Sequence, residues 1–321
     1  MTELAKLKSL SEWSKLRNAF ESKVLAQMGT LPKERGELQT KVLDEVQFSG
    51  YTRRRVNYFI DEWERVSAWL FVPDGKEEVP AILCCHQATP HGKDEPAGLA
   101  GEPELAYARH YAEMGYVTLA PDCLTTGDRV SHGLEPFNAA AFYKENPRQS
   151  IMGKMLWDHM YAIDLLCETK RVDSARLGVV GHGLGAQNAL FLVSFDERVQ
   201  VCVASCGFTR LREDTRPDPW RPEDGLLCFP KLKDLVKKGE YPFDLEELLA
   251  LAAPSPTMLI TALNDVTIPN TKSCDKAVEY AKKVYKLLGA ASALRNYTHT
   301  SGHRMPPDGL QESDEWFERW L

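Results

Sequence analysis

The chain has 321 residues, of which 43% are hydrophobic and 26% are charged, as is usual for a soluble globular enzyme. This length is enough for a large core in one big α/β domain or two smaller ones. A formal net charge of −7 argues against a broad face for nucleic acid, so we expect no nucleic-acid partner. No run approaches the eighteen or more apolar residues that cross a bilayer, so we also expect no membrane partner.

The first ten residues carry charges and have no apolar signal-peptide core, which predicts a cytoplasmic protein. The eight cysteines agree with this location, because they lie within apolar runs and form no C-x-x-C pair for zinc or redox chemistry. The histidines lack H-E-x-x-H spacing, which argues against a zinc hydrolase. The sequence therefore predicts no metal site and no cofactor.

Helical spacing of apolar residues over 3–29 predicts an amphipathic segment, and we expect residues 1–40 to pack on a main domain formed by 41–321. From 41 to 73 the pattern changes to strand-like alternation, interrupted by turn residues. That pattern predicts an antiparallel meander at the start of the main domain.

After residue 73 the chain alternates between short apolar strands and helices. We expect strands at 81–86, 116–120, 177–180, 199–204, 257–261 and 291–297, and helices at 104–114, 152–168 and 310–321. Continuous apolar strands separated by helices predict an α/β fold with a mostly parallel mixed sheet covered on both faces. Two insertions rich in Pro, Gly and charge, 87–103 and 207–242, interrupt the alternation. The first follows a strand's carboxyl end, where open α/β sheets bind ligands.

Residues 176–190, RLGVVGHGLGAQNAL, have the form of a strand, a glycine-rich turn and a helix. This order is typical of the nucleophile elbow G-x-S-x-G of serine hydrolases. Gly181 and Gly185 occupy the outer positions of that motif, but Gly183 stands where the serine is expected. The frame of a serine hydrolase is thus predicted without its nucleophile.

The partners of an elbow serine follow it in the chain order acid and then base. The strand PTMLITALND ends in Asp265, and His303 lies on the loop before the last helix. We prefer His303 to His299 as the base because Gly302 and two prolines flank it. A histidine removes the proton of a serine hydroxyl, and a carboxylate fixes the imidazole tautomer and stabilises its charged form.

Two backbone amides are expected to form an oxyanion hole, those of Leu184 at the start of the helix and Gln87 after the strand AILCCH. We place His86, His182 and Lys93 in the substrate pocket. The alternatives are a structural hydrogen bond for His86 and a solvated charged loop around Lys93. Ser205 and Cys206, at the end of the following strand, are weaker candidates for a substitute nucleophile.

The chain resembles the α/β-hydrolase superfamily, particularly the esterases similar to dienelactone hydrolase and acetyl xylan esterase. The segments that carry the resemblance are AILCCHQATPHGKDEPAGLAG, YVTLAPDCLTTGDR, LGVVGHGLGAQNALFLVSFDERVQ, ITALNDVTIP and SGHRMPPD. The elbow of such esterases usually reads G-H-S-x-G, so His182 matches and Gly183 departs. The resemblance implies carboxylic-ester hydrolase ancestry, a small-molecule ester as substrate and the possibility of a homodimer.

Three explanations of Gly183 remain open at this point. The first is an inactivated variant that holds substrate. The second is a naturally silent homologue that binds a ligand or partner. The third is a catalyst that activates water with the His303–Asp265 pair as base. A different class, a dinucleotide-dependent oxidoreductase, is suggested by G-x-G-x-x-A at 181–186. That alternative lacks the acidic residue expected at the end of the next strand, where Ser205 and Cys206 stand.

Overall fold

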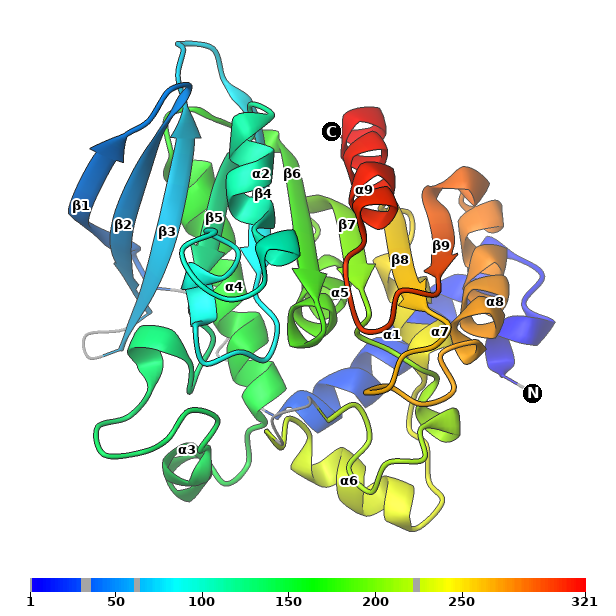
Figure 1. Ribbon diagram of the computed structural model, residues 1–321. Helices are drawn as coiled ribbons and strands as arrows, with labels where there is room; N and C mark the ends of the chain where they lie inside the picture. The colour runs from blue at the N-terminus through cyan, green and yellow to red at the C-terminus, as the bar shows by residue number, and fades with distance from the viewer. Residues whose placement is uncertain (1, 30–35, 61–63, 222–225) are drawn as a thin grey trace.

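A computed structural model describes residues 2–29, 36–60, 64–221 and 226–321. Within them, nine strands form one sheet in the order β1-β2-β3-β5-β4-β6-β7-β8-β9 (Figure 1). The strands are β1 (Gln39–Gln47), β2 (Tyr51–Phe59), β3 (Arg65–Pro73), β4 (Val79–Cys85), β5 (Val117–Pro121), β6 (Val172–His182), β7 (Val199–Ser205), β8 (Thr257–Ala262) and β9 (Leu294–His299).

The sheet combines an antiparallel start with a parallel remainder. β1, β2 and β3 pair antiparallel, and β3 pairs antiparallel with β5. From β5 through β4 to β9 every neighbouring pair is parallel. The predicted meander and the mixed, mostly parallel sheet are therefore confirmed.

Helices cover both faces of this sheet (Figure 1). The helices are α1 (Leu10–Met28), α2 (Tyr107–Glu113), α3 (Ala140–Glu145), α4 (Ile151–Glu168), α5 (Leu184–Phe195), α6 (Pro230–Lys237), α7 (Leu245–Ala252), α8 (Ser273–Leu287) and α9 (Pro307–Trp320). None of the described helices is long and apolar enough to cross a membrane.

Side chains that alternate along the buried strands supply two separate cores. In β4, Leu83 and Cys85 join the core that includes residues of α4, α5, α7 and α8, whereas Ile82 and Cys84 join the core that includes residues of α2 and α9. A strand that is apolar on both faces needs a helix layer on each. The N-terminal helix α1 adds to the first of these layers, since it packs on α4 and α7.

Two helices that the sequence analysis did not predict lie between β7 and β9. α7 begins with a capping box in which the side chains of Asp244 and Glu247 each accept a hydrogen bond from the backbone N–H of the other residue. α8 is amphipathic and presents a buried row that includes Ala277, Ala281 and Val284. Both signals are present in the sequence, so these helices were predictable.

The insertion at 207–242 is held to the body by an aromatic cluster. Trp220 is fully buried and packs against Phe191, Phe208, Phe229 and Phe243. Its indole N–H donates to the carbonyl of Thr209 at 2.8 Å. These contacts fix the described part of the insertion beside the carboxyl ends of the parallel strands.

The start of α5 packs against the end of β4 with no room for a side chain. A Cβ built on Gly185 would lie 1.9 Å from the carbonyl oxygen of Cys85. We expect Gly185→Ala to lower the free energy of unfolding by about 3 kcal/mol or more, because backbone atoms must move to relieve the overlap. Chemical denaturation measures this loss.

Gly239→Ala is the matched control for that substitution. Gly239 has φ of +76° and open space around its Cβ position, so alanine there meets only backbone strain of about 1–2 kcal/mol. Equal losses for the two variants would contradict the close approach of α5 to β4.

Candidate active site

The loops after β8 and β9 bring a carboxylate and an imidazole together. His303 Nδ1 lies 2.8 Å from Asp265 Oδ2, and the Asp265 side chain is fully buried. The other carboxylate oxygen, Oδ1, accepts hydrogen bonds from the amides of Thr267 at 2.8 Å and Ile268 at 2.9 Å. The turn that follows Asp265 therefore holds its carboxylate in place, and the carboxylate orients the His303 ring.

These contacts also set the charge of Asp265. Burial opposes ionisation of the carboxyl group, but the hydrogen bond and charge of His303, together with the two turn amides, outweigh it and lower the pKa of Asp265. The carboxylate is thus ionised across the neutral range.

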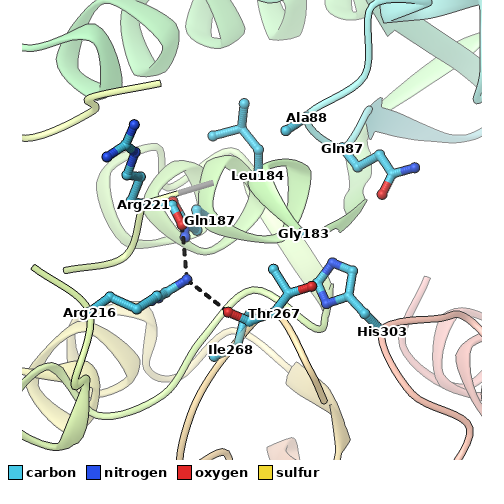
Figure 2. A pocket seen from close by; sticks show the side chains of 10 residues that line it. All are labelled: Gln87, Ala88, Gly183, Leu184, Gln187, Arg216, Arg221, Thr267, Ile268 and His303. Carbon is cyan, nitrogen blue, oxygen red and sulfur yellow. Dashed lines mark hydrogen bonds between the residues drawn. The ribbon is translucent and has the colours of Figure 1, made fainter. Parts of the chain in front are cut away.

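Gly183 faces the other nitrogen of the same imidazole. Its backbone has φ of 54° and ψ of −117°, a conformation that L-residues with a side chain rarely adopt. A Cβ built on Gly183 would lie 3.4 Å from His303 Nε2 and 3.5 Å from the Cβ of Gln87. Figure 2 shows the His303 ring beside the turn at Gly183. A side chain on residue 183 would therefore project between His303 and the loop after β4.

Two backbone amides border the same space. Leu184 is the first residue of α5, and Gln87 directly follows β4. Neither amide donates a hydrogen bond to another residue in the described part of the chain. The amino end of an α-helix attracts negative charge, so an oxyanion placed between these two amides is favoured.

A small pocket opens at this point (Figure 2). Its lining residues come from the loop after β4, the start of α5, the insertion at 207–242, the turn after β8 and the loop before α9. They are Gln87, Ala88, Gly183, Leu184, Gln187, Arg216, Arg221, Thr267, Ile268 and His303.

Both pocket arginines already have carboxylate partners. Arg216 binds Asp214 through Nε and Nη2, and it donates through Nη1 to the carbonyls of Arg221 and Thr267. Arg221 Nη1 lies 2.9 Å from Asp218. Asp218 also binds Lys233 at 2.6 Å, so its single negative charge is shared between two cations.

His86 connects the loop that carries Gln87 to the loop after β5. The side chain is fully buried, its Nε2 accepts from the amide of Cys123 at 3.0 Å, and its Nδ1 lies 2.6 Å from the carbonyl oxygen of Gln87. Because Nε2 accepts a hydrogen bond, Nδ1 carries the proton and donates. Burial disfavours the charged imidazolium and lowers the pKa of His86. The imidazole of His86 is not among the groups that line the pocket.

Lys93 is also absent from the pocket lining. Its ammonium lies 2.8 Å from Asp122 and 2.9 Å from Asp128, and only 3% of the residue is exposed. A charged loop next to a ligand site suggests contact with solvent or substrate. Here the ammonium of Lys93 pairs with the buried Asp122 and the partly exposed Asp128 instead, which fixes the loop after β4 to the loop after β5.

His182 lies behind the pocket wall. The residue is 1% exposed, and its Nδ1 lies 3.0 Å from Ser205 Oγ. Its ring centroid is 4.8 Å from that of His303, at a steep angle between the ring planes. Sequence reasoning placed His182 in the pocket and did not identify Gln187, Arg216, Arg221, Thr267 or Ile268, which line it.

This site and sheet invite comparison with known folds. A glucuronoyl esterase from Solibacter usitatus superposes with a TM-score of 0.77 at 17% identity, over 97% of this chain and 94% of that one. An acetyl xylan esterase from Paenibacillus sp. R4 gives a TM-score of 0.64 at 17% identity, over 98% and 96%. Residues 66–220 match the dienelactone hydrolase family. The chain has the α/β-hydrolase fold.

A curated relative agrees with this assignment. The chain is 24% identical over 276 residues to a Bacillus subtilis (strain 168) protein named "Putative hydrolase YtaP", and the match covers 80% of this chain and 84% of the relative. The family match and this relative support a hydrolase family for the chain, and the structural neighbours have the same fold. The fold that the resemblance implied is therefore confirmed.

We expect Asp265→Asn to lower the free energy of unfolding by about 1–3 kcal/mol at pH 7, because the charged hydrogen bonds of the carboxylate are lost. The pKa of Asp265 is lower in the folded chain than the ordinary value of 3.8. Its stabilising contribution is therefore complete above that value and is lost as the pH falls through the folded pKa.

Denaturant unfolding at a series of pH values measures the difference between the native chain and Asp265→Asn. The difference should shrink as the pH falls below about 4. A difference that does not shrink in this acidic range would contradict the lowered pKa of Asp265.

Proposed function

We propose that this α/β-hydrolase is a carboxylic-ester hydrolase of the serine-triad type in which residue 183 lacks the nucleophile. The observation that carries the proposal is the 3.4 Å between His303 Nε2 and the position of a Cβ on Gly183. A serine oxygen on that carbon would be within hydrogen-bonding reach of the base. The substrate is a small-molecule ester held at the pocket of Figure 2.

With serine at position 183, the reaction follows from the placed groups. His303 Nε2 takes the hydroxyl proton as Oγ attacks the ester carbonyl carbon, and Asp265 stabilises the imidazolium that forms. The amides of Leu184 and Gln87 hold the developing oxyanion. Proton transfer from His303 to the leaving oxygen releases the alcohol. Water then gives a proton to His303 Nε2 as it attacks the acyl carbon, and return of that proton to Oγ releases the acid.

With Gly183, no acyl-enzyme can form at this position. The amides, the pocket and the His303–Asp265 pair remain, so the chain retains the means to bind an ester and to polarise its carbonyl. Any hydrolysis then depends on water deprotonated by His303, which lacks the positioning that a covalently fixed hydroxyl provides. We therefore propose a chain that binds its ester and turns it over slowly.

The second candidate is a naturally silent protein of the hydrolase fold that binds a ligand without hydrolysing it. It is favoured by the relaxed backbone of Gly183, because glycine tolerates φ of 54° without the strain that a serine would carry. The two candidates make opposite predictions for the chain with serine restored.

We expect Gly183→Ser to raise kcat for chromogenic acyl esters by about 100-fold or more, since the nucleophile of a triad contributes several orders of magnitude. The assay uses acetylated sugars, lactones and small aliphatic esters. The serine variant should also react covalently with an organophosphonate, which mass spectrometry detects as one adduct per chain. The native chain should give no adduct.

Two variants control for a merely structural effect. Gly183→Ala introduces the same Cβ and the same backbone strain without a hydroxyl, so it should stay as slow as the native chain. Gly183→Ser combined with His303→Ala should lose the gained activity. A silent Gly183→Ser variant that still binds esters tightly would favour the ligand-binding candidate and remove the catalytic roles of Asp265 and His303.

A further inference from the structure

We propose that His182, Cys206 and His303 form a binding site for a zinc ion beside Gly183. One ligand atom from each of these side chains lies within 4.8 Å of the others. Two imidazole nitrogens and a thiolate are a donor set that suits Zn²⁺. The three residues come from the end of β6, the segment after β7 and the loop before α9.

The first argument concerns a nitrogen without a partner. His182 Nε2 is buried and makes no hydrogen bond to the described residues, although the whole residue is only 1% exposed. The other ring nitrogen, Nδ1, lies 3.0 Å from Ser205 Oγ. Donation from Nδ1 to this hydroxyl leaves the lone pair of Nε2 free. An unpaired buried acceptor is costly, and a cation is one way to satisfy it.

His303 has the same arrangement with a stronger partner. Its Nδ1 pairs with the Asp265 carboxylate at 2.8 Å, and its Nε2 points to the space at Gly183. Metal-binding histidines usually donate one ring N–H to a carboxylate, carbonyl or hydroxyl and ligate through the other nitrogen. Both imidazoles therefore already have the outer partners that orient ligands.

Cys206 supplies the third donor from an unusual backbone position. It has φ of 50°, and its thiol is buried within 3.9 Å of His299 and 3.5 Å of the carbonyl of Arg304. A non-glycine residue in the left-handed region is strained. Its sulfur lies within 4.8 Å of a ring nitrogen of His182 and of His303, and it forms no disulfide.

The vacant side of residue 183 completes the site. Zinc bond lengths of about 2.0–2.3 Å place tetrahedral ligands about 3.4–3.7 Å apart, so the three side chains need to close by about 1 Å. Gly183 has no side chain in this space, which leaves the fourth position for water. A serine at position 183 would occupy part of it.

Binding releases the proton of the Cys206 thiol to solvent, because a thiolate is the ligand. Zinc on His303 Nε2 also prevents that nitrogen from accepting a proton. Occupancy of the cation site and base catalysis by His303 therefore exclude each other. The proposal does not depend on ester hydrolysis, and the test below measures binding alone.

Titration of the chelator-treated full chain with Co²⁺ tests the site. We expect one Co²⁺ per chain, with a thiolate-to-metal absorption in the near ultraviolet and visible bands of tetrahedral cobalt, and we expect Zn²⁺ to displace it. Cys206→Ser should abolish the thiolate absorption. His303→Gln, whose side chain lies in a partly exposed loop, should weaken Co²⁺ binding at least tenfold.

Cys167→Ser is the matched control, because Cys167 is a half-buried cysteine outside the cluster, and it should leave the spectrum unchanged. Circular dichroism verifies that each variant is folded. A native chain without the cobalt bands would overturn the proposal, and so would a thiolate absorption that persists in Cys206→Ser. If the serine variant does not fold, unchanged Co²⁺ affinity in His303→Gln overturns it equally.

Discussion

The close packing of the turn from β6 into α5 is the constraint on which the site depends. A Cβ on Gly181 would lie 2.2 Å from the backbone of Gly185, and one on Gly207 would lie 2.9 Å from the carbonyl oxygen of Gly183. Backbone therefore rests on backbone at each of these positions. This packing aims residue 183 at His303 and leaves the amide of Leu184 facing the pocket. A looser turn would separate His303, the amides of Leu184 and Gln87, and residue 183 from one another.

The same turn geometry opposes conformational stability to nucleophilic chemistry at residue 183. The conformation of Gly183 costs about 1–3 kcal/mol for a residue with a side chain, and glycine avoids that cost. A serine there would gain a hydroxyl next to His303 and lose this relief. The native chain thus has the more stable turn but no hydroxyl at position 183, and it retains the other residues of the site. Because Gly183→Ala carries the strain without the hydroxyl, the two effects are separable in one set of variants.

The sequence predicted the elbow, the meander and the parallel series because each depends on local pattern and on chain order. Asp265 and His303 were chosen as acid and base in the same way, from their places after late strands. Burial in loops was less accessible: Lys93 looked exposed, but Asp122 and Asp128 enclose its ammonium. The pocket lining by Arg216 and Arg221 depends on how the insertion folds back through Trp220. No spacing rule encodes such contacts between distant segments.

The proposed cation site shows this limit most sharply. Zinc motifs are recognised in sequence when ligands lie three or four residues apart on one element. His182, Cys206 and His303 lie on three separate segments, which meet only because parallel strands end at the same edge of the sheet. Sequence reasoning therefore predicted no metal site, whereas the fold assembles three donors. His303 belongs to both proposed arrangements, so its Nε2 can act as a base toward an ester or ligate a cation, but not both at once.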